Sequence, residues 1–64
     1  MFNSRAFVQT YFHRKVCNIF GCKLEGYVFT SDKLIIRYTV DGEEYKHTAT
    51  ATDLILYLAE YGRH

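Results

Sequence analysis

The sequence contains no proline and no tryptophan, and only one methionine and two cysteines among its 64 residues. Because it also lacks low-complexity and linker-like segments, we expect one domain over residues 1–64 without an internal repeat. No apolar run approaches the roughly 20 residues that a membrane-spanning helix needs. Met1 also leads into no uninterrupted apolar core of a secretory signal peptide. We therefore expect a cytoplasmic chain that does not enter the membrane.

The chain also lacks an excess of charge of either sign. Eight Lys and Arg residues stand against seven Asp and Glu residues, which gives a net charge of +1. This balance argues against strong nonspecific nucleic-acid binding and against DNA mimicry. Hydrophobic residues make up 48% of the chain, which is too many for a disordered protein. A chain this short buries only about 60% of its unfolded surface, so its stability is marginal without a disulfide, a metal or a partner chain.

The pair Asp41-Gly42 predicts a β-hairpin, because it lies between two runs of alternating residues. A type I′ turn needs positive φ at both central residues, and an Asp-Gly pair adopts it readily. The two-residue turn sets the strand register and separates an apolar face from a polar one. The apolar face carries Leu34, Ile36, Tyr38, Val40, Tyr45, His47 and Ala49, and the polar face carries Ile35, Arg37, Thr39, Glu44, Lys46 and Thr48.

Residues 4–20 are interpreted as a helix. Their apolar residues recur at spacings of four, four and three, which is the period of one helix face. Asn3 or Ser4 can cap the start, and Gly21 stands where a left-handed residue ends many helices. The composition of the segment suits a strand on propensity alone, so a fourth strand is the alternative.

The remaining elements predict an α+β fold in the order α-β-β-β-α. Residues 22–30 form a strand in which Gly26 marks a bulge or a close backbone approach, so the three strands make an antiparallel meander. Thr52 is expected to cap the last helix, and Gly62 to end it. The expected core consists of Val8, Phe12, Val16, Ile19, Leu24, Val28, Leu34, Ile36, Tyr38, Val40, Tyr45, Leu54 and Leu58.

The last helix has few polar residues, and this points to a binding surface. Only Asp53 and Glu60 give the helix polarity, and Leu56 points away from its expected buried side. A surface helix normally keeps a wide polar face, so in so small a domain this helix implies a partner. A scattered surface leucine is the ordinary alternative. Interfaces favour aromatic anchors, and the candidate interface residues are Tyr11, Leu56, Tyr57 and Tyr61.

The sharpest pattern for chemistry is His13, Cys17 and Cys22, because the first two share one helix face. With His47 or His64 they would complete a tetrahedral zinc site of two Cys and two His ligands. The C-x4-C spacing lacks the second compact pair of most zinc modules, so we favour two free thiols, with no metal and no other cofactor. A Cys17–Cys22 disulfide would close a very short loop, and we expect it to add little stability.

No motif in the sequence predicts catalysis. Cys17 near His13 or Lys15 has the residue types of a thiolate and its base, but no recognisable nucleophile motif surrounds it. The sequence shows no paired carboxylates, no phosphate-binding glycine loop and no Ser-His-Asp order. So short a chain also leaves little room for a substrate pocket. We therefore expect a protein that is not an enzyme.

The sequence favours a small non-enzymatic protein-interaction module. Such a module self-associates as a homodimer, or it docks on a larger protein as an adaptor or inhibitor. The compact, proline-free, Tyr- and Phe-rich chain is of the kind that a phage or mobile element encodes. One alternative is a zinc-stabilised mini-domain. The other is a small nucleic-acid-binding domain that uses Arg14, Lys15, Lys23 and Arg37.

Overall fold

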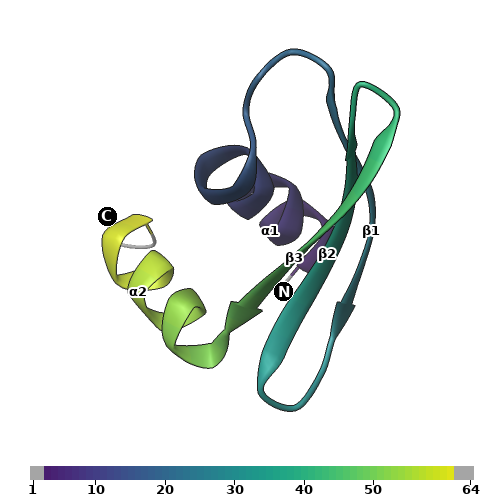
Figure 1. The fold of residues 1–64 in the computed structure, drawn as a ribbon. Helices are drawn as coiled ribbons and strands as arrows, with labels where there is room; N and C mark the ends of the chain where they lie inside the picture. Colours follow the sequence, from purple (N-terminus) through teal and green to yellow (C-terminus); the bar gives the residue numbers. More distant parts are fainter. Residues whose placement is uncertain (1–2, 62–64) are drawn as a thin grey trace.

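The computed structural model describes residues 3–61, which form a helix, a three-stranded sheet and a second helix (Figure 1). The first helix continues without a break into one π-helical segment. The predicted α+β fold and the order α-β-β-β-α are confirmed. In chain order the elements are α1 (Ser4–Tyr11), η1 (Phe12–Val16), β1 (Cys22–Phe29), β2 (Lys33–Val40), β3 (Glu43–Thr50) and α2 (Ala51–Tyr61).

The strands form an open antiparallel sheet in the order β1-β2-β3. The β2–β3 hairpin has the predicted register over its whole length. Asp41 and Gly42 have φ values of 53° and 88°, the signs that a type I′ turn requires. The predicted irregularity in β1 is also present, because its register with β2 shifts between Leu24 and Gly26.

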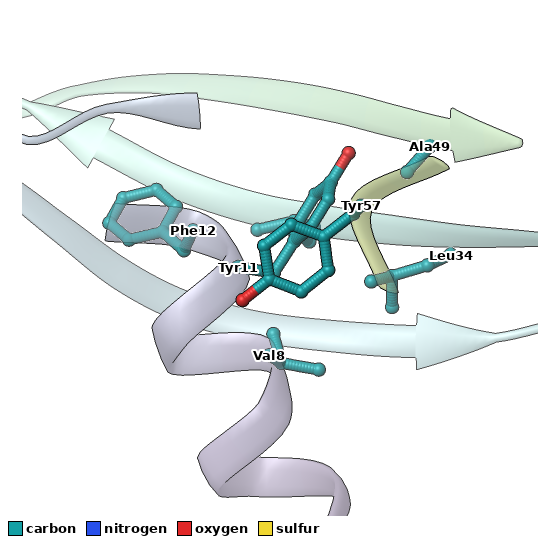
Figure 2. Packing of buried hydrophobic residues seen from close by; sticks show 7 residues of the cluster. Val8, Tyr11, Phe12, Leu34, Ala49 and Tyr57 are labelled. Atoms are coloured by element: carbon teal, nitrogen blue, oxygen red, sulfur yellow. The ribbon is translucent and has the colours of Figure 1, made fainter. Parts of the chain in front are cut away.

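Both helices lie on the same side of the sheet, and the core fills the space between them and the strands (Figures 1 and 2). Three core residues come from the first helical segment, three from β2 and β3, and one from α2. The buried hydrophobic residues are Val8, Tyr11, Phe12, Leu34, Ile36, Ala49 and Tyr57.

The first helical segment is shorter than predicted. Asn3 caps it, since its side chain accepts a hydrogen bond from the Ala6 amide at 3.1 Å. The segment ends at Val16, and Cys17 is already extended because it is bonded to Cys22 at the start of β1. Gly21 has a φ of +98° but lies in the loop, where its carbonyl accepts a hydrogen bond from the Asp41 amide at 3.3 Å.

The start of α2 also differs from the prediction, because Thr50 and not Thr52 is the cap. The Asp53 amide donates to the Thr50 hydroxyl at 3.2 Å, and the Thr50 amide donates to the Asp53 carboxylate at 3.0 Å. These two bonds make a reciprocal capping box. Since Thr50 is the last residue of β3, the helix follows the strand without a loop. The predicted end at Gly62 lies outside the described residues.

The core prediction was wrong at four positions, which are exposed: Ile19, Val28, Tyr45 and Leu58. Ile19 lies beyond the end of the helical segment. The bulge in β1 reverses the alternation after it, and Val28 therefore faces away from the helices. Tyr45 lies on an edge strand, and Leu58 is turned outward because Tyr57 occupies the inner side of α2.

Candidate protein-interaction surface

A single large side chain anchors α2 in the core. The Tyr57 ring meets the Tyr11 ring edge to face, with centroids 5.0 Å apart (Figure 2). It also meets the Phe7 ring, with centroids 5.7 Å apart. Leu54 is half-buried against the same cluster. These contacts set the rotation of α2 about its own axis, because Tyr57 is the only residue of this helix that is fully buried.

The side of α2 opposite Tyr57 carries no charge. Successive residues of an α-helix are about 100° apart, so both charged residues, Asp53 and Glu60, fall together on one flank. Ile55 is 65% exposed, Leu56 63% and Leu58 49%. The residues on this side are called the outer face of α2, and they are Ala51, Thr52, Ile55, Leu56, Leu58 and Ala59.

A shallow groove between α1 and α2 adjoins this face. Its volume is about 270 Å³. Leu58 belongs both to the groove wall and to the outer face, so the two surfaces are continuous. The described residues that line the groove include no charged side chain, and they are Ala6, Phe7, Thr10, Tyr57, Leu58 and Tyr61.

Polar contacts hold the charged flank of α2 against η1. The Lys15 ammonium donates to the Glu60 carboxylate at 3.0 Å, and this hydrogen bond raises the pKa of Lys15. The Arg14 guanidinium lies 4.6 Å from the centroid of the Tyr61 ring, and the Lys15 ammonium lies 5.3 Å from it. Both distances are within the range of cation–π attraction. The charged flank thus makes contacts within the chain, whereas the apolar side chains of the outer face stay exposed among the described residues.

The structure places the four candidate interface residues in three different environments. Leu56 is exposed on the outer face, and Tyr61 lies at its edge, 37% exposed. Tyr11 and Tyr57 are buried in the core, and burial is the main cause that raises the pKa of Tyr11. Ile55 and Leu58 were not among the predicted candidates, although both lie in the uncharged run of residues 54–59.

The candidate zinc ligands do not come together. Cys17 and Cys22 are joined in a disulfide, so the prediction of free thiols was wrong. The exposed His13 ring packs on Phe12, whereas His47 lies 6.3 Å from the Tyr11 ring. Within residues 3–61 no three His, Cys, Asp or Glu side chains are arranged to hold a metal ion. The further candidate His64 lies outside the described residues.

The candidate nucleic-acid residues fall on two opposite sides of the molecule. Arg14 and Lys15 belong to η1 and contact α2. Lys23 and Arg37 point to the other side of the sheet, because their neighbours along the strands face the helices. The four residues therefore do not form one continuous basic surface.

Comparisons with known protein families, with curated proteins and with solved structures found no match to this chain. No helix within residues 3–61 is long and apolar enough to cross a membrane.

Proposed function

We propose that this protein is a small non-enzymatic interaction module that binds another protein through the outer face of α2. The observation that carries the proposal is the exposure of Ile55 and Leu56, which are about two-thirds accessible on a helix side without charge. Each Å² of apolar surface removed from water contributes roughly 25 cal/mol. Contiguous exposed apolar patches of this kind mark interaction sites.

The geometry also defines the kind of partner surface that would fit. A complementary surface is apolar and uncharged, since a charge placed against Ile55 or Leu56 would lose its water without gaining a partner. The groove between α1 and α2 offers a recess beside the ridge of Leu58, where one apolar side chain of the partner can insert. A protein with this surface acts as an adaptor or as an inhibitor of the larger protein that it covers.

The test is a pair of matched substitutions from an apolar residue to Asp. Leu56→Asp lies on the outer face, whereas Val28→Asp is similarly exposed on the opposite side of the sheet. We expect Leu56→Asp to abolish capture of the partner from a cell lysate and Val28→Asp to retain it. Leu56→Asp adds like-charge pairs with Asp53 and Glu60 that cost about 0.2–0.5 kcal/mol each, so circular dichroism must first show that both variants stay folded. The proposal fails if Leu56→Asp leaves both partner capture and solution mass unchanged.

A further inference from the structure

The two edge strands of the sheet differ in how well they are protected from pairing with another strand. β1 carries the bulge at Leu24–Gly26, which interrupts its edge. β3 keeps an unbroken register with β2 over all its residues, and no strand of the described chain lies on its outer side. A flat, unpaired edge is a template for the addition of a further strand.

The hairpin turn decides which backbone groups of β3 point outward. In a two-residue turn the flanking residues Val40 and Glu43 form a hydrogen-bonded pair, and bonded and non-bonded pairs then alternate. Glu44, Lys46 and Thr48 therefore direct their N–H and C=O groups away from β2. The amide of Thr50 has the same direction but is already bonded to Asp53, so the free edge runs over residues 44–48.

The side chains on this edge carry charges that the chain itself leaves unpaired. Lys46 lies directly opposite Arg37 on the same sheet face, and two like charges in that position repel each other. Within residues 3–61 the single ion pair joins Lys15 and Glu60, so neither Glu44 nor Lys46 has an ionic partner.

We infer that a second copy of this chain pairs with this edge, β3 against β3 in antiparallel orientation, about a two-fold axis at Tyr45. Glu44 of each copy then lies opposite Lys46 of the other, which forms two identical ion pairs across the axis. The outward direction of both residues makes each of these a hydrogen-bonded backbone pair. Glu44 and Lys46, which have no ionic partner in the single chain, thus each lie opposite a charge of the other sign.

The neighbouring registers are excluded by the same groups. An axis at Lys46 places the Lys46 side chains of the two chains directly opposite each other. An axis at Glu44 places the two Glu44 carboxylates opposite each other, so both registers bring like charges together. An axis at His47 brings Glu44 against Thr50, whose amide is bonded to Asp53 at the start of α2. Of these registers, only the axis at Tyr45 sets Glu44 against Lys46 with the outward backbone groups of both residues free.

Aromatic side chains support the same register on the helix side of the sheet. The exposed Tyr45 ring is stacked on Tyr38, with centroids 5.7 Å apart and an angle of 24° between the planes. At the two-fold axis the Tyr45 rings of the two chains lie side by side, so the stack of Tyr38 and Tyr45 continues into the second chain. The turn end of β3 lies away from α2 (Figure 1), and this helix approaches β3 at His47, beyond the Glu44–Lys46 pairs.

Charge exchange on the whole chain tests the inference by light scattering over a range of concentrations. We expect the original chain to be a dimer, and Lys46→Glu or Glu44→Lys to weaken dimerisation at least about tenfold, because each puts like charges across both pairs. An equimolar mixture of the two variants should dimerise again, since their edges carry complementary charges. Lys46→Glu also gives Arg37 an opposite charge within the chain, so the fold of this variant is preserved.

Two results would overturn the inference. The first is a monomer at every concentration, and the second is a dimer whose mass is unaffected by either charge variant. If Leu56→Asp alone dissociates such a dimer, the chain pairs through the outer face of α2, and only the inference about β3 is lost. A β3 dimer that captures no partner through Leu56 would instead overturn the proposed function and leave this inference standing.

Discussion

The more hydrophobic of the two helical segments of this protein is the less buried one. α2 is the more hydrophobic helix, yet it contributes one of the seven buried residues, whereas α1 and η1 together contribute three. The apolar residues of the first segment point to one side, toward the sheet, and those of α2 are spread around the helix. Burial thus follows the direction in which apolar side chains point, and the surplus apolar residues of α2 stay exposed.

The largest expected effect comes from the first helical segment. Phe12→Ala removes a fully buried ring and should lower the free energy of unfolding by about 3–5 kcal/mol. Leu56→Ala, the control on α2, should change it by no more than about 0.5 kcal/mol. Urea denaturation at one protein concentration measures both values. Similar losses in the two variants would show that α2 is buried as deeply as the first helix.

The second prediction concerns the anchor of α2. Tyr57→Ala should cost about 3 kcal/mol, at the low end for a large aromatic side chain, because the site opens to the groove and can partly collapse. Tyr57→Phe is the matched control, since it keeps the ring contacts with Tyr11 and Phe7. Thermal unfolding followed by circular dichroism compares the two. If both variants melt alike, Tyr57 does not hold α2 in place.

The third prediction concerns the disulfide that ends the first helical segment. Replacing Cys17 and Cys22 together by Ser should cost about 2 kcal/mol, a small value because the closed loop is short. A reducing agent should destabilise the original chain by a similar amount and leave the double variant unchanged. An equal response of both proteins to the reducing agent would contradict the presence of the bond.

The smallest effect is expected from the capping box of α2. Hydrogen bonds from the backbone and then the side chain of Thr50 lower the pKa of Asp53 in the folded protein. A lowered folded pKa means that the ionised carboxylate stabilises the fold above its ordinary pKa of about 4, and that this contribution is lost as the pH falls through the folded value. The stability difference between the original chain and Asp53→Asn should therefore shrink in acid. A constant difference between neutral and acidic pH would be the contrary result.

Much of the fold could be predicted because its signals are local. Asp41-Gly42 specifies the hairpin and its register through the φ values of two residues. The sequence also indicated an exposed apolar side of the last helix, because Leu56 points away from the side that was expected to be buried. The boundary at Val16 was missed because it depends on a bond to another element. The cap at Thr50 was missed although its pairing with Asp53 is local, because Thr52 offers a second capping residue in the same segment.

The amino-acid sequence by itself determined the order of the elements, the type I′ turn and the small number of charges on α2, since these depend on residue types and their spacing. Only the tertiary structure decided which side of α2 is buried. The Tyr57 ring reaches Tyr11 and Phe7 on α1, and that contact turns Ile55 and Leu56 outward. The same holds for the bulge, because one extra residue in β1 reverses which side chains face the helices. Periodicity specifies which residues lie together on an element, but contacts with other elements select the side that is covered.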